Sequence, residues 1–125
     1  MTTQDENRET VQRLIDAINN HRLDEFHAQF APEAVMEYPQ SGERIVGDAN
    51  RRAVYAATPS LPTLKPRRLI ATGDIVVAEL DYHSSEDYLA VFLFRLRQAK
   101  IIYQIAYWTQ PFAAPAWRSE WVEKK

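Results

Sequence analysis

Four runs of β-branched and aromatic residues fill the second half of the chain and limit what it can fold into. They are RRLIAT, DIVVAELDYH, DYLAVFLFRL and KIIYQIAYW, and they cover residues 67–72, 74–83, 87–96 and 100–108. Residues of these types favour strands, and short polar breaks separate the runs. Connections that short join neighbouring strands in antiparallel pairs. The sequence therefore predicts an antiparallel meander as the framework of the fold.

The first half of the chain has helical rather than strand periodicity. Val11, Leu14, Ile15 and Ile18 fall on one stripe, as in a helix that packs against a sheet. We predict helices over residues 5–21, from Leu23 to the break at Pro32, and from the cap Asp48 to Pro59, and extended pieces over 34–38 and 44–46. Phe26 and Phe30 would share a face of the second helix. This order predicts an α+β fold, with helices on one face of a curved antiparallel sheet.

A length of 125 residues fits a single domain, so we assign residues 1–125 to one unit. The strand over 87–96 has apolar side chains on both faces, and one face would pack on the helices. A second copy of the chain is the simplest cover for the other face, which predicts a homodimer. The tail, residues 111–125, carries Trp117 and Trp121 four positions apart. We expect it to pack on the surface or on a partner chain.

The composition excludes several classes of function. The chain has no cysteine, so it has no disulfide scaffold, thiolate metal site or thiol nucleophile. Its net charge of −2 comes from interspersed acids and bases, so we expect no nucleic-acid partner. No apolar run approaches the ~20 residues that span a bilayer, and MTTQDENRET is not a secretory leader, so we expect a cytoplasmic protein with no membrane contact. We also expect no cofactor and no metal site.

Three titratable residues alternate along the second run of the meander. Glu79, Asp81 and His83 share one face of that strand. If this face lines a cavity, Asp81 and His83 form the best general acid and base pair in the chain. If it faces water, Val76, Ala78, Leu80 and Tyr82 form the matching buried face. The sequence leaves both arrangements open.

The stretches FAPEAVMEYP, RIVGDANRRAVY and KIIYQIAYW, in this order, resemble the nuclear transport factor 2-like superfamily. That superfamily includes ketosteroid isomerase and the SnoaL-like polyketide cyclases. The resemblance covers nearly the whole chain. It implies a cone-shaped curved sheet wrapped around three helices, with a deep apolar cavity between them.

The ketosteroid isomerase pattern also implies which catalytic groups this chain lacks. Its general base position falls on Tyr38, its tyrosine donor on Leu14, and its aspartic acid donor on Phe92 or Val91. The resemblance retains a supporting tyrosine at Tyr55 and a cavity tryptophan at Trp108. A tyrosine with a pKa of about 10 is a poor base at neutral pH, so the familiar isomerase mechanism is not expected here.

Helical spacing and strand alternation together predict a set of residues that line the cavity and bind a ligand. They are Leu14, Ile18, Phe30, Tyr38, Tyr55, Phe92, Gln104 and Trp108. Tyr38 would be either an acid or part of the wall, and Gln104 either orients a ligand or is a satisfied core amide.

Two functions follow from this pattern. The first is cofactor-free binding and conversion of a small apolar or aromatic, oxygenated compound by isomerisation, cyclisation, dehydration or hydrolysis. Its catalytic candidates are Tyr38, Asp81 and His83. The alternative is a non-catalytic ligand-binding or dimeric interaction module.

Overall fold

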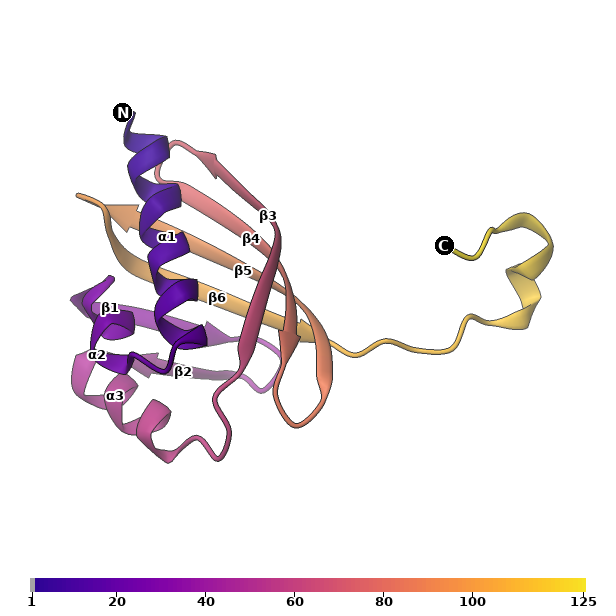
Figure 1. Cartoon of the computed structure of the whole chain (residues 1–125), viewed down its shortest axis with the longest axis horizontal. Coiled ribbons are helices and arrows are strands. Elements are labelled where there is room, and N and C mark those ends of the chain that lie inside the picture. The colour runs from indigo at the N-terminus through magenta and orange to yellow at the C-terminus, as the bar shows by residue number, and fades with distance from the viewer. Residues whose placement is uncertain (1) are drawn as a thin grey trace.

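The computed structural model describes residues 2–125 and shows helices gathered on one face of a curved, open sheet (Figure 1). The helices are α1 (Thr3–Asn19), α2 (Leu23–Ala28) and α3 (Asp48–Ala57), and the tail has a 3₁₀ helix, η1 (Ala116–Trp121). The strands are β1 (Phe30–Tyr38), β2 (Glu43–Val46), β3 (Thr63–Thr72), β4 (Ile75–His83), β5 (Asp87–Arg97) and β6 (Lys100–Thr109). The α+β class and the four-strand meander are confirmed.

The sheet has the order β2-β1-β6-β5-β4-β3. Every neighbouring pair is antiparallel except β1 and β6, which run parallel. The sequence predicted a curved antiparallel sheet, and the parallel β1–β6 pair is the one departure from it among the described strands. The difference arises because β1 and β6 are far apart along the chain, so no hairpin fixes their relative direction. Helix α1 lies along the concave face and packs on β3, β4 and β6.

Two prolines that were expected to end or connect elements lie inside strands. The predicted second helix ends at Ala28, and Pro32 belongs to β1. Its missing N–H is tolerated because the β1–β6 register is interrupted between Phe30 and Val35. Phe30 is therefore a strand residue, although its ring still lies 5.4 Å from that of Phe26. Pro66 lies in the edge strand β3, next to another register shift.

The core forms where the stripe of α1 meets the inward-facing side chains of the sheet. Val11, Leu14, Ile15 and Ile18 are all buried, as their spacing predicted. A capping box starts this helix: the Thr2 hydroxyl accepts from the Asp5 N–H at 3.1 Å, and the Thr2 N–H donates to the Asp5 carboxylate. Among residues 2–125, no helix is long and apolar enough to cross a bilayer.

A buried arginine joins α2, α3 and β1. Arg51 is 1% exposed; its Nε donates to His27 Nδ1 at 3.1 Å, and its Nη2 donates to Asp48 at 2.7 Å. The guanidinium also lies 4.2 Å from the centre of the Phe30 ring. Asp48 is thus the first residue of α3 and pairs with arginine, while Gly47, at φ 85°, takes the cap position predicted for Asp48.

This arrangement keeps His27 neutral. Burial, and secondly the charge of Arg51, lower the pKa of His27 to about 4, from an ordinary value of 6.5. A neutral His27 can accept the proton of Arg51 Nε at Nδ1, whereas an imidazolium cannot.

We predict that this histidine makes folding sensitive to mild acid. Below pH 6.5 the unfolded chain binds a proton at His27 that the folded chain excludes until about pH 4. The stabilisation is therefore complete above pH 6.5 and is lost as the pH falls toward 4, by about 2–3 kcal/mol. Urea unfolding at several pH values should show this loss in the natural protein.

The matched variant is His27→Asn, whose Oδ1 can still accept from Arg51 but does not titrate. Its free energy of unfolding should change less between pH 6.5 and 4 than that of the natural chain. His21→Asn, at an exposed site, serves as the control. Identical pH profiles for the natural chain and His27→Asn would contradict the assignment.

Candidate functional site

A small inner pocket lies between the helices and the concave face of the sheet. Its volume is about 80 Å³, which holds roughly two or three water molecules. Seven of the eight residues predicted to line a cavity surround it: Leu14, Ile18, Tyr38, Tyr55, Phe92, Gln104 and Trp108. Phe30 does not, because its ring is covered by Phe26 and Arg51. The role of the seven in ligand binding stays a prediction.

Sequence reasoning missed several residues of this pocket. Phe26, Met36, Leu64, Tyr82 and Ala106 also line it. Tyr82 had a usable signal, because it follows Val76, Ala78 and Leu80 on the apolar face of its strand. The alternation predicts that Tyr82 belongs to the buried face but does not show that this part of the face borders a pocket.

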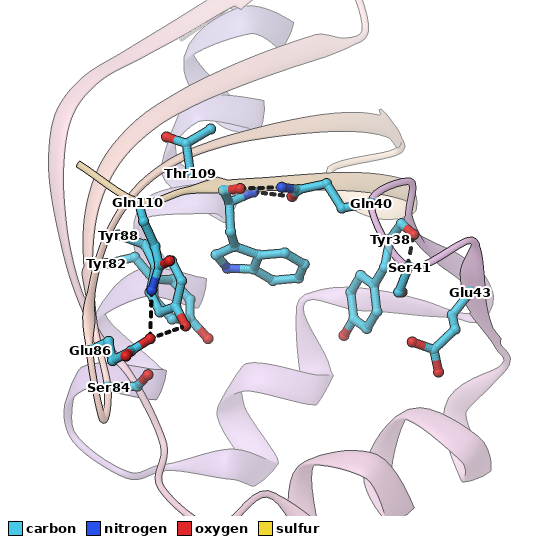
Figure 2. A pocket seen from close by; sticks show the side chains of 11 residues that line it. Tyr38, Gln40, Ser41, Glu43, Tyr82, Ser84, Glu86, Tyr88, Thr109 and Gln110 are labelled. Atoms are coloured by element: carbon cyan, nitrogen blue, oxygen red, sulfur yellow. Dashed lines mark hydrogen bonds between the residues drawn. The ribbon is translucent and has the colours of Figure 1, made fainter. Parts of the chain in front are cut away.

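An open outer cleft of about 770 Å³ adjoins the inner pocket (Figure 2). Tyr38, Tyr82 and Trp108 line both spaces, so we call these three residues the aromatic partition. The Trp108 ring centre lies 5.0 Å from that of Tyr38 and 6.0 Å from that of Tyr82, both edge to face. The partition therefore stands between the small inner pocket and the open outer cleft.

The side chain of Gln40 fixes the backbone of Trp108. Its Oε1 accepts from the Trp108 N–H at 2.6 Å, and its Nε2 donates to the Trp108 carbonyl. The backbone ladder between β1 and β6 reaches only Glu37 and Ile105. Gln40 thus continues that pairing with a side-chain amide, as the dashed lines in Figure 2 show. Nothing in the sequence separates this glutamine from an ordinary turn residue.

The polar groups of the inner pocket are neutral. Burial raises the pKa of Tyr82 to about 12 and that of Tyr55 well above its ordinary value. Burial also raises the pKa of Tyr38, and interaction with the Tyr55 hydroxyl partly offsets this. All three phenols therefore keep their protons at pH 7. They can donate a hydrogen bond to a ligand oxygen, but they are poor bases.

Two further polar atoms in this wall lack partners. Within residues 2–125, neither the buried Gln104 Oε1 nor the buried Trp108 Nε1 makes a hydrogen bond. The indole N–H lies near the Tyr82 hydroxyl without reaching hydrogen-bonding geometry. An unpaired buried acceptor and donor each cost about 1–3 kcal/mol, which a ligand or water with complementary groups would recover.

The row of titratable residues on β4 lies on the other face of the sheet. Asp81 pairs with Arg67 at 2.9 Å, Glu79 pairs with Arg68 at 3.0 Å, and His83 pairs with Asp87. Val76, Ala78 and Leu80 are buried on the opposite face. These ion pairs, together with the burial of the alternate residues, select the solvent-facing arrangement. Asp81 and His83 are not brought to the pocket, so Tyr38 alone of the three catalytic candidates reaches it.

The chemical capacity of the site follows from this lining. Among the described residues, neither a carboxylate nor an imidazole lines the inner pocket. Within residues 2–125, no three histidine, aspartate or glutamate side chains converge as metal ligands. The residues present can orient a molecule and polarise its oxygen atoms.

The comparisons with known proteins agree with this fold. The family model of the SnoaL-like domain matches residues 11–104. A nuclear transport factor 2-like protein of unknown function from Burkholderia xenovorans is 29% identical, with 97% of this chain and 96% of the other covered and a TM-score of 0.86. No curated protein matches.

Two further solved structures share the fold at lower identity. A proposed ketosteroid isomerase from Kribbella flavida is 24% identical over 100% of this chain and 93% of the other, with a TM-score of 0.90. An epoxide hydrolase from M. tuberculosis is 18% identical over 86% and 85%, with a TM-score of 0.75.

We predict that Gln40 controls the order of Trp108. In Gln40→Leu the side chain keeps its bulk but leaves the N–H and carbonyl of Trp108 to solvent. The Trp108 amide should exchange its hydrogen about fivefold faster or more, because about one net hydrogen bond is lost. Exchange measured by NMR in Gln40→Leu and in the neighbouring control Ser41→Ala tests this. Equal Trp108 exchange rates in both variants would show that Gln40 is not the restraint.

Proposed function

Because the chain belongs to the SnoaL-like domain family, we propose that it binds one small, largely apolar, oxygenated molecule at the aromatic partition without a cofactor. The observation that carries this is the set of neutral hydrogen-bonding groups in an otherwise apolar wall. The unpaired Gln104 Oε1 and Trp108 Nε1 supply one acceptor and one donor. Tyr38 and Tyr55 supply hydroxyls beside them.

The volumes suggest how such a molecule would sit. By itself the inner pocket is too small to enclose a whole two-ring compound, since typical small-molecule sites measure about 300–1,000 Å³. A ligand would place an apolar end in the inner pocket and extend past Trp108 into the outer cleft. Rotation of the partition side chains would enlarge the inner space, since Trp108 meets Tyr38 and Tyr82 edge to face.

Binding is the primary proposal, and catalysis is secondary to it. The reported relatives include a proposed ketosteroid isomerase and an epoxide hydrolase, which supports a small-molecule substrate class. The wall here offers no ionisable base, so any conversion of the ligand would rely on Tyr38 as a neutral acid that hydrogen bonds to a substrate oxygen. Isomerisation of ketosteroid type is not proposed, because tyrosine stands where that mechanism needs a carboxylate.

We predict that Tyr38→Phe weakens the binding of an oxygenated ligand but not that of a purely apolar one. The ring contact with Trp108 should persist, so the fold and the binding of a purely apolar aromatic compound such as naphthalene should be preserved. Binding of its hydroxylated analogue 2-naphthol should weaken about three- to tenfold, the effect of one hydrogen bond. Calorimetry with both compounds on both proteins makes the measurement. Equal loss for the two compounds, or no loss for either, would make Tyr38 merely a wall residue.

We also propose that the chain forms a homodimer through the outer face of the sheet. Leu89, Val91 and Tyr107 are each about two-fifths exposed there. The tail leaves the body after β6 (Figure 1), and its Phe112, Trp117 and Trp121 are at least 75% exposed. Isolated apolar side chains are common on surfaces, but a sheet face and an aromatic tail together suit a partner chain.

Light scattering at micromolar concentration should therefore give twice the chain mass. Val91→Lys should shift the protein toward monomer, because it places a charge in the centre of the outer face. Val54→Lys, on α3 and away from the outer face of the sheet, is the matched control, because Val54 is 40% exposed and Val91 39%; it should remain dimeric. A monomer mass for the natural chain would overturn the dimer proposal.

A further inference from the structure

We propose that the outer cleft recognises an organic ammonium group, such as a quaternary or tertiary amine. This concerns the entrance of the pocket rather than its interior. It rests on the proposed function only in that both spaces would be used by one ligand. Three features carry it: the aromatic walls, the two carboxylates, and the lack of basic groups in the lining.

Four aromatic rings line the cleft and meet at steep angles. Tyr82 and Tyr88 lie 5.8 Å apart at 81°, Tyr82 and Trp108 6.0 Å apart at 78°, and Tyr38 and Trp108 5.0 Å apart at 68°. Rings set at such angles form corners, so a cation in the cleft can approach more than one ring. The attraction of a cation to ring faces is strongest for tryptophan and tyrosine. Because burial keeps Tyr38 and Tyr82 protonated, their rings remain neutral hosts.

Two carboxylates supply negative charge on opposite sides of this space. Figure 2 shows Glu43 beside Tyr38 and Glu86 beside Tyr82 and Tyr88. Neither glutamate forms an ion pair within residues 2–125. Glu86 is held in place by the Tyr88 hydroxyl at 3.1 Å and by Gln110 Nε2 at 2.6 Å. Among the residues that the structure describes, no lysine, arginine or histidine lines the cleft, so no basic side chain in its wall offsets the two carboxylates.

The same geometry favours an organic cation over a metal ion. Calcium and magnesium need several oxygen ligands that converge on one point at about 2.0–2.6 Å. Here the carboxylates stand on separate walls, with aromatic surface between them. A weakly hydrated ammonium group needs no convergent ligands and gains from both the ring faces and the field of the carboxylates. A cleft of about 770 Å³ has room for such a head group and the rest of a ligand.

The test compares choline with 3,3-dimethyl-1-butanol, which has the same shape but carbon in place of the charged nitrogen. Calorimetry should show choline binding about tenfold more tightly, as expected for a cation between tyrosine and tryptophan rings with nearby carboxylates. In an NMR spectrum the indole signal of Trp108 should shift with choline, while those of Trp117 and Trp121 should not. Equal affinities for the two compounds, or shifts confined to the tail tryptophans, would overturn the proposal.

Substitutions distinguish the contribution of the carboxylate charges to choline binding from that of the aromatic rings. Glu43→Gln and Glu86→Gln should each weaken choline two- to fivefold without weakening 3,3-dimethyl-1-butanol. Glu6→Gln makes the same charge change at an exposed position of α1 and should leave choline binding as it was. Tyr88→Leu should lose more choline affinity than Tyr88→Phe, which keeps the ring. If both glutamate variants behave like Glu6→Gln, the cleft does not recognise charge.

The result of the choline test does not depend on whether a ligand enters the inner pocket. Choline is short enough to occupy the cleft alone, so it can bind even if no oxygenated compound enters the inner pocket. Conversely, binding of 2-naphthol that depends on Tyr38, together with no preference for choline, would support the proposed function and reject the ammonium site.

Discussion

The parallel pairing of β1 with β6 is the contact on which the rest of the molecule depends. It joins the helical first half of the chain to the meander, which is otherwise built from neighbouring hairpins. It also brings the end of β1 beside the end of β6, so that Tyr38 and Gln40 meet Trp108. Without this pair, Tyr38 would lie apart from Tyr82 and Trp108, which both belong to the meander.

The inner pocket and the outer cleft differ in charge: the lining of the pocket is neutral, whereas the cleft carries two carboxylates. Inside, burial suppresses ionisation, and every polar group is a neutral donor or acceptor. Outside, Glu43 and Glu86 face solvent without basic partners in the cleft wall. A molecule with one charged and one neutral end would therefore meet a matching environment at each end, and its orientation in the site would be fixed by that difference alone.

Local patterns in the sequence were enough to predict most elements of the fold. The helical stripe from Val11 to Ile18 and the β-branched runs after Pro66 each favour one secondary structure, and packing agrees with both. The predictions of element boundaries were wrong where contacts between distant parts of the chain determine the local structure. Pro32 is accommodated by an irregular register with β6, which lies some 70 residues further along the chain, and Gly47 caps α3 because Asp48 pairs with Arg51 instead.

The residues of the site were likewise predicted where local geometry is sufficient and missed where distant contacts matter. Alternation along a strand or helix placed seven predicted residues around one pocket, because facing depends only on local geometry. Alternation alone does not show which face of β4 is exposed to solvent. Glu79 and Asp81 lie on the exposed face, where they form ion pairs with the arginines of β3. Gln40 was missed because its partner is the backbone of Trp108, and a backbone partner leaves no trace in the sequence.

The position of Gln110 ties the tail to the cleft. Gln110 donates to Glu86 at the mouth and is followed directly by Pro111, where the tail begins. A force or contact that moves the tail therefore acts on the hydrogen bond that orients Glu86. If the tail docks on a partner and that contact moves Gln110, docking of the tail and binding in the cleft would influence each other's affinity to the same degree. Assembly and ligand capture in this protein would then be coupled equilibria, with one glutamine side chain as the mechanical link.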